Sequence, residues 1–210
     1  MLLAVGHRRN FPTSQIIKIV NTSTFEEVKD GEVGELWISG PSVTAGYYGK
    51  EELSRECFGV SIKEGDSNSN QARFLRTGDQ AFFENDYLYI CGRIKDLIIV
   101  NGVNYYPQDI ESAVQQASSF VRPGCVAAFS LDDNKGSNDL EILFEIRSTL
   151  NENNESEIMN IIDKIREDVF VKVGLLPTRI VVIKERSILK TTSGESMNVM
   201  NYPNNLHQIL

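Results

Sequence analysis

The chain has 210 residues, 41% of them hydrophobic and 24% charged, and its 29 acidic and 21 basic residues give a formal net charge of −8. This composition is typical of globular proteins, and the length allows one or two domains. The acidic balance, without any long block of lysine and arginine, argues against a protein that binds nucleic acid or anionic membranes. Because there is no secretory signal and no run of roughly 20 apolar residues, we expect a cytoplasmic protein without a transmembrane segment.

The first 90 residues have the alternating pattern of β-strands. Residues 16–20 (IIKIV) and 34–39 (GELWIS) predict two strands separated by a segment rich in turn residues. Residues 80–91 predict a hairpin that turns at residues 84–86 (END). We therefore expect this part of the chain to be all-β.

After Gly92 the pattern changes to alternating strands and helices. A short apolar strand at 96–100 is followed by Asn101-Gly102, a dipeptide that favours tight turns. Helical spacing or an apolar run then predicts a helix from Pro107, strands at 125–131 and 140–146, a helix at 156–170 and a strand at 179–183. We expect a compact α+β unit with both helices on one face of its sheet, and a domain boundary after Gly92 that divides the chain into 1–92 and 93–210.

Three short segments carry residues that are able to bind a ligand. Residues 76–79 (RTGD) place a glycine beside a carboxylate, which is able to accept hydrogen bonds from a vicinal diol, although TGD is also a common turn. Residues 92–96 (GRIKD) concentrate charge at the expected boundary, where Arg93 is able to hold a hydroxyl or a phosphate, although an ordinary salt bridge accounts for these residues equally well. Residues 191–194 (TTSG) form a hydroxyl-rich segment that is also typical of a surface loop.

The order and spacing of four segments resemble the later half of the adenylate-forming acyl synthetases. These segments are GELWISGPSVTAGYYGKEE, FLRTGDQAFF, YLYICGRIKDLIIVNGVNYYPQDIE and LKTTSG. The similarity is greatest to the fatty acyl-AMP ligases, which share the GRxKDLII stretch and the RPGCxAAFS segment at 122–130. The resemblance extends over residues 15–197, and four motifs in the same order make it specific.

This resemblance implies an enzyme that activates a fatty acid with ATP and Mg²⁺ and transfers the acyl group to an acyl carrier protein or to coenzyme A. It implies that Asp79 binds the ribose hydroxyls, that Arg93 holds the same sugar, and that Lys95 is the hinge of a small C-terminal domain. Gly102 would lie in the loop that this domain carries to the active site. Residues 1–92 would then be a β-rich remnant of the large AMP-binding domain, and residues 93–210 the mobile α+β lid domain.

Two departures from the family pattern affect the expected activity. The family's phosphate-binding loop, its adenine-supporting segment and its acyl tunnel lie upstream of the matched region, so we expect a part of a ligase that is inactive alone. The family's C-terminal loop also ends in a lysine where this chain has Glu195. The alternative hypothesis is a noncatalytic module, derived from the same family, that binds a carrier protein.

Overall fold

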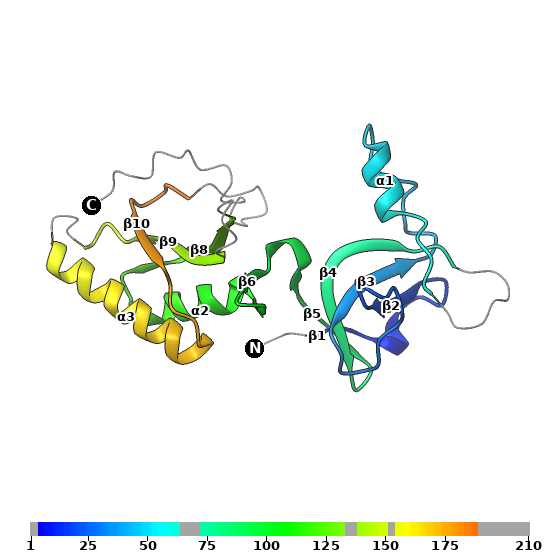
Figure 1. Cartoon of the computed structure of the whole chain (residues 1–210), viewed down its shortest axis with the longest axis horizontal. Helices are drawn as coiled ribbons and strands as arrows, with labels where there is room; N and C mark the ends of the chain where they lie inside the picture. The colour runs from blue at the N-terminus through cyan, green and yellow to red at the C-terminus, as the bar shows by residue number, and fades with distance from the viewer. Residues whose placement is uncertain (1–3, 64–71, 133–137, 151–153, 189–210) are drawn as a thin grey trace. The chain divides into compact units, whose positions relative to one another are not determined.

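The computed structural model describes residues 4–63, 72–132, 138–150 and 154–188. The chain divides into two compact units, Met1–Lys95 and Asp96–Leu210. The division falls inside a short 3₁₀ helix, η2 (Ile94–Asp96), three residues beyond the boundary expected from the sequence. Each unit has its own sheet and its own hydrophobic core (Figure 1).

The first unit contains a five-stranded antiparallel sheet in the order β1-β5-β4-β3-β2. Its strands are β1 (Ala4–His7), β2 (Ile16–Val20), β3 (Gly34–Ser39), β4 (Leu75–Glu84) and β5 (Tyr87–Arg93). A short 3₁₀ helix, η1 (Arg8–Asn10), follows β1. The strands predicted at 16–20 and 34–39 are confirmed, as is the hairpin, whose turn residues Asn85 and Asp86 both have positive φ.

A hydrophobic core lies on each face of β3, which explains why none of its residues is exposed. Leu36 packs in one core with residues of β2, β4 and β5, whereas the neighbouring Trp37 is fully buried in a second core with Phe74. Successive side chains of a strand point to opposite faces, so one strand supplies both cores. β3, which supplies residues to both cores, is therefore packed on both of its faces.

The expectation that the first 90 residues are all-β is wrong, because this part contains an α-helix in addition to the short η1. Residues Glu51–Cys57 form a helix, α1, whose first turn is acidic and in which no residue is buried. The Ser54 hydroxyl oxygen accepts a hydrogen bond from the N–H of Tyr47 (2.8 Å) and so ties the helix to the loop before it. Since α1 buries no apolar face, its sequence lacks the periodicity by which a helix is recognised.

The second unit contains a three-stranded sheet in the order β10-β9-β8 and two helices. Its main elements are α2 (Pro107–Ala117), β8 (Val121–Asp132), β9 (Asn138–Ile146), α3 (Glu155–Val173) and β10 (Arg179–Ile183). β8 is antiparallel to β9, and β10 is parallel to β9. No helix in the described part of the chain is long and apolar enough to cross a membrane.

Both helices of this unit cover the same face of its sheet, as expected from the sequence (Figure 1). Ile110 and Val114 of α2 and Ile165 of α3 are fully buried against Ile142 and Phe144 of β9. The side chains on the opposite face of the sheet form a smaller core that includes Cys125, Leu143, Ile183 and Ile188. Burial of this apolar surface is the main force that holds the unit together.

A small hairpin precedes α2. β6 (Ile98–Val100) pairs with β7 (Val103–Tyr105), and the two turn residues Asn101 and Gly102 have φ values of 52° and 76°. The turn is confirmed, but β7 was not expected, because three residues are too few to display an alternating pattern. The buried Ile98 joins this hairpin to the main core of the unit.

Candidate functional site

The segment of residues 76–79 forms a bulge in β4. Between the paired positions Trp37–Arg76 and Glu35–Gln80, β3 has one residue whereas β4 has three. Gly78, in the middle of the bulge, has a φ of 75°, a conformation that favours glycine. Because a bulge bends its strand and redirects the neighbouring side chain, this irregularity sets the direction of Asp79.

Asp79 and Arg93 face each other across the β4–β5 pairing. The Arg93 Nε donates a hydrogen bond to the Asp79 Oδ1 at 3.0 Å, and the Arg93 Nη2 reaches the carbonyl oxygen of Thr77 at 3.4 Å. The Asp79 and Arg93 side chains are 34% and 52% exposed. Among the described residues the second oxygen, Oδ2, accepts no hydrogen bond, so the pair presents both an acceptor and spare N–H donors to a ligand.

A buried carboxylate that sequence reasoning missed lies behind this pair. Glu35 of β3 is 2% exposed. Its Oε2 accepts a hydrogen bond from the Arg76 Nε at 3.0 Å, and its Oε1 accepts one from the N–H of Gly78 at 3.1 Å. The available signal was the position of Glu35, which lies two residues before Trp37 and therefore on the same buried face of the strand.

The rest of the bulge is also attached to β3. The Thr77 hydroxyl donates to the carbonyl oxygen of Leu36 at 2.8 Å and accepts the N–H of Asp79 at 3.1 Å. The Arg76 guanidinium lies over the rings of Phe25 (5.3 Å) and Trp37 (5.8 Å). The backbone from residue 76 to residue 79 is thus fixed by hydrogen bonds, and the Asp79 carboxylate remains accessible.

The other residues singled out from the sequence do not belong to this cluster. Lys95 is exposed in η2 and is the last residue of the first unit. Gly102 is exposed in the turn between β6 and β7 of the second unit. Glu195 and the 191–194 segment lie outside the described residues. Of the predicted site residues, the structure brings Asp79 and Arg93 together.

Comparison with known proteins supports one family. No protein-family model matches the chain. The probable long-chain-fatty-acid–AMP ligase FadD30 of Mycobacterium tuberculosis is 37% identical over 184 residues, which are 86% of this chain and 30% of FadD30. The medium-chain-fatty-acid–[acyl-carrier-protein] ligase JamA of Moorena producens is 35% identical over 179 residues, 85% of this chain and 29% of JamA.

The chain corresponds to a C-terminal part of the AMP-binding fatty acyl ligases. It spans about 30% of the length of the curated relatives that it matches. A solved structure, of McyG A-PCP complexed with phenylalanyl-adenylate, has a TM-score of 0.72 and 30% identity and covers 93% of this chain and 32% of that chain. The α+β fold of this chain is therefore shared with solved adenylation-domain structures.

In the second unit another buried carboxylate anchors residues 186–188, which follow β10. Glu145 of β9 is fully buried and accepts hydrogen bonds from the N–H groups of Arg186 (3.0 Å) and Ile188 (2.6 Å) and from the Arg122 guanidinium (2.6 Å). Burial alone would raise the pKa of Glu145, but the hydrogen bonds from Ile188, Arg122 and Arg186 outweigh it, so the pKa is lowered. Glu145 therefore remains charged and holds the backbone at Arg186 and Ile188.

Glu111, the glutamate of the YPQDIE motif, has the opposite shift. Its Oε1 accepts a hydrogen bond from the N–H of Ala128 at 3.2 Å and links α2 to β8. Burial raises the pKa of Glu111 to about 7, and the hydrogen bond from Ala128 opposes that rise only in part. Glu111 therefore binds a proton near neutral pH much more readily than an ordinary glutamate does.

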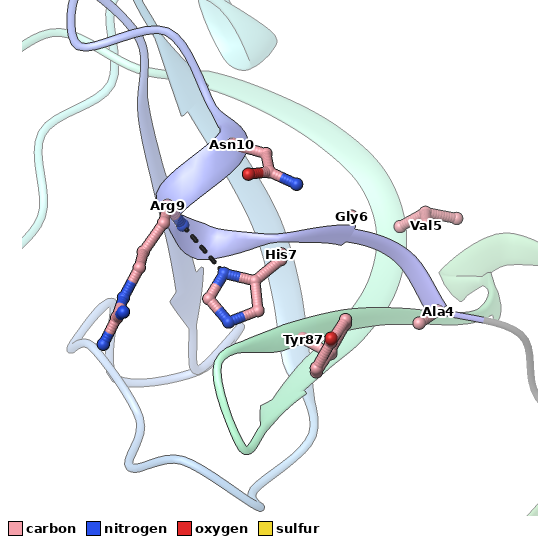
Figure 2. Close-up of a pocket in the computed structure, with 7 residues that line it drawn as sticks. All are labelled: Ala4, Val5, Gly6, His7, Arg9, Asn10 and Tyr87. Atoms are coloured by element: carbon pink, nitrogen blue, oxygen red, sulfur yellow. Dashed lines mark hydrogen bonds between the residues drawn. The ribbon is translucent and has the colours of Figure 1, made fainter.

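A separate cavity of about 470 Å³ lies beside β1 in the first unit (Figure 2). Its lining includes His7, whose Nδ1 accepts the N–H of Arg9 at 3.1 Å and whose ring meets Tyr87 edge-on. Tyr87 begins β5, whereas Arg93 ends it, so this cavity lies away from the Asp79–Arg93 pair. The described residues contain no group of three or more His, Cys, Asp or Glu side chains that is able to hold a metal ion.

Proposed function

We propose that this chain supplies the ribose-binding strands and the mobile C-terminal domain of an ATP-dependent ligase that converts a fatty acid into an acyl-adenylate. The observation that supports this most strongly is the Asp79–Arg93 pair on the β4 bulge, 3.0 Å apart and accessible. It occurs within a chain whose curated relatives are named as fatty-acid ligases. The substrates of the whole enzyme would be a fatty acid and ATP.

The chemistry of the pair suits the sugar of a nucleotide. The hydroxyls of a ribose are two adjacent donors, and a carboxylate accepts both through its two oxygens. In the proposed complex Asp79 accepts these hydrogen bonds, and Arg93 contributes its free N–H groups to the same sugar. ATP or AMP would therefore be held through its ribose by the end of the β4–β5 pairing.

We further propose that Lys95 is the pivot and that Gly102 belongs to a loop that approaches the reacting groups in one of two half-reactions. Lys95 ends the first compact unit, and a rotation there would move the second unit as a body. The tight turn at Asn101-Gly102 gives a stiff, exposed tip to the β6–β7 hairpin. Because Ile98 joins this hairpin to the core of the second unit, the tip would move together with that unit.

The acyl acceptor is proposed to be an acyl carrier protein or coenzyme A. JamA is named as a ligase for an acyl carrier protein, which supports the first of these. The Mg²⁺ that accompanies ATP has no fitting set of ligands among the described residues, so we assign no residue of this segment to it. Use of ATP and a carrier protein would be consistent with a cytoplasmic location.

Glu195 is expected to slow the adenylation step. The family lysine at this position would stabilise negative charge as it develops, and loss of one such donor costs about 100 to 1000-fold in rate. A carboxylate in its place adds repulsion toward the phosphate and the substrate carboxylate. The proposed ligase would therefore bind its nucleotide but form the adenylate slowly.

The test is a chimera in which the part of FadD30 upstream of the matched region is joined to this chain. We expect weak ATP–pyrophosphate exchange with fatty acids, an increase of about 100-fold on Glu195→Lys, and loss of that gain when Asp79→Asn is added. The chain alone should show no exchange.

Three outcomes would contradict the proposal. Exchange by the chain alone would show that the upstream part is dispensable. Exchange that Asp79→Asn leaves unchanged would remove the ribose assignment. A Glu195→Lys chimera that binds ATP and still shows no exchange would favour the carrier-binding module instead.

A further inference from the structure

We propose that Glu35 is the positioning residue of the Asp79–Arg93 pair, which it orients through the backbone of the bulge without touching the ligand. The inference rests on the proposed ribose-binding role of that pair. Glu35 lies 43 residues before Gly78 in the sequence, and its carboxylate nevertheless accepts the N–H of the residue directly before Asp79.

The burial of the Glu35 carboxylate is compensated by specific hydrogen-bond partners. A carboxylate that is 2% exposed is costly unless hydrogen bonds and an opposite charge compensate its lost hydration. Here its two oxygens have separate partners: Oε2 faces the Arg76 guanidinium and Oε1 faces the Gly78 N–H. The same side chain therefore holds the first residue of the bulge and its centre.

Glu35 is connected to Asp79 through a single residue, Gly78, whose N–H it accepts. Gly78 has a left-handed conformation, which a flexible loop would not maintain by itself. The hydrogen bond from its N–H to Glu35 fixes the peptide at that point. The Thr77 hydroxyl holds the next N–H, that of Asp79, against β3. The direction of the Asp79 carboxylate thus follows from the position of Glu35.

Both ends of this arrangement are rigid. Glu35 projects from a strand whose next residues, Leu36 and Trp37, are buried in two different cores. Arg76 has a side chain that is 29% exposed, and its guanidinium lies over Phe25 and Trp37. A charged hydrogen bond between fixed groups gives stronger orientation than one between mobile side chains.

The test compares Glu35→Gln with Glu26→Gln, an exposed glutamate of the same unit, in the 210-residue chain. The side-chain amide nitrogen introduced by Glu35→Gln would face the donors of Arg76 or Gly78, so one of the two bonds is lost while the shape is kept. The readout is the NMR signal of the Arg93 Nε–H in the ligand-free protein, which a change in stability alone would not move. We expect faster solvent exchange of this proton in Glu35→Gln, roughly tenfold, and no change in Glu26→Gln.

A titration with AMP separates this proposal from the proposed function. We expect AMP to shift the Asp79 and Arg93 signals in the wild-type protein and the affinity to fall roughly tenfold in Glu35→Gln. If AMP shifts neither signal in the wild type, the ribose assignment fails, while the Arg93 proton still decides whether Glu35 orients the pair. Wild-type exchange of that proton in Glu35→Gln overturns the positioning role.

A second variant covers the case in which Glu35→Gln does not fold. Arg76→Lys keeps the positive charge next to Glu35 but removes the planar guanidinium that meets the carboxylate through Nε and Nη2. Folding is followed by the fluorescence of Trp37, the single tryptophan. A folded Arg76→Lys protein should show faster exchange of the Arg93 proton, and an unchanged rate would contradict the proposal.

Discussion

Asp79 and Arg93 occupy facing positions on β4 and β5, with the Arg93 Nε 3.0 Å from the Asp79 Oδ1. Both side chains are partly exposed, so this ion pair contributes little to the stability of the fold. Its accessible carboxylate oxygen and guanidinium N–H groups suit the ribose-binding role proposed above.

Asp79→Asn should therefore separate binding from stability. The substitution keeps the shape but removes the charge and one acceptor oxygen, so AMP affinity should fall by about 10 to 100-fold. The free energy of unfolding should change by less than about 1 kcal/mol. AMP titration followed by NMR, together with thermal unfolding, measures both quantities.

The matched control is Asp86→Asn in the hairpin turn of the same strand pair. Asp86 has a φ of 66°, which asparagine tolerates, and its salt bridge to Arg8 is long, at 3.6 Å. The Asp86→Asn variant should keep the wild-type affinity for AMP. Equal losses of affinity in the two variants would point to a general charge effect instead of a ribose contact.

Gly78→Ala tests the bulge itself. Gly78 has a φ of 75°, and no atom lies within 4 Å of the Cβ that alanine would add, so the cost is backbone strain without a clash. We expect a loss of about 1 kcal/mol in the free energy of unfolding. We also expect weaker AMP binding, because relief of the strain would turn Asp79 away from Arg93.

Gly49→Ala provides the comparison for this prediction. Gly49 belongs to the same unit, has a φ of 69° and likewise has open space around its added Cβ. It should lose a similar amount of stability, by urea denaturation, and keep its AMP affinity. If both variants bind AMP equally well, the geometry of the bulge does not control the site.

Glu145→Gln should destabilise the second unit strongly. The buried carboxylate accepts hydrogen bonds from Arg122 and from the N–H groups of Arg186 and Ile188, and an amide would oppose one of these donors with another. We expect a loss of about 3 kcal/mol at pH 7, measured by urea denaturation. Glu141→Gln on the same strand, whose partner Arg179 is 3.7 Å away, should lose less than about 1 kcal/mol.

The effect of Glu145→Gln should depend on pH. The folded-state pKa of Glu145 lies below its ordinary value of 4.5, so its contribution is fully present above pH 4.5 and is lost as the pH falls through the folded-state pKa. The difference between wild type and variant should therefore shrink in acid. A difference that is the same at pH 7 and in strong acid would show that Glu145 is not held as an anion.

Glu111→Gln should have the opposite dependence on pH. Burial raises the pKa of Glu111 from 4.5 to about 7, so the folded protein binds a proton more tightly, and this group destabilises the fold as the pH rises from 4.5 to 7. The glutamine variant keeps an acceptor for the Ala128 N–H and cannot ionise. It should be more stable than wild type at pH 8 by roughly 2 kcal/mol, with a smaller gain at pH 5.

Chemical denaturation at several pH values measures this effect. The control is Glu167→Gln on α3, whose side chain is 67% exposed and whose partner Lys164 retains Asp168. It should show a change of less than about 1 kcal/mol at every pH. A Glu111→Gln gain that does not vary between pH 5 and pH 8 would contradict a raised pKa.

The elements that the sequence predicted well are those whose burial imposes a regular pattern. β3 and β10 were predicted with the observed bounds, and α3, expected at 156–170, extends over Glu155–Val173. β8 begins at Val121, before the expected residue 125. The strand continues through a bulge that contains Pro123 and Gly124, and this dipeptide is typical of a turn. α1 and β7 were missed, since one buries no side chain and the other has three residues.

The site was predictable only in part, for a related reason. The motifs RTGD and GRIKD singled out Asp79 and Arg93, because a glycine beside a carboxylate and a cluster of charges are local features. Glu35, Arg76 and Thr77 were not assigned a function, because their roles depend on contacts between β3 and β4. Glu35 and Arg76 are 41 residues apart, and no local pattern reports that their side chains meet.

The sequence by itself determined the α+β class, the order of the main strands and helices, and the family to which its motifs point, since hydrophobic periodicity and short motifs are properties of neighbouring residues. Only the tertiary structure decided that a buried glutamate supports the bulge and that Asp79 and Arg93, which the resemblance assigned to one sugar, form a direct ion pair. Those features depend on strand register, which brings together residues far apart in the chain. Register thereby determines how deeply a carboxylate is buried and which groups it contacts, and these determine its role.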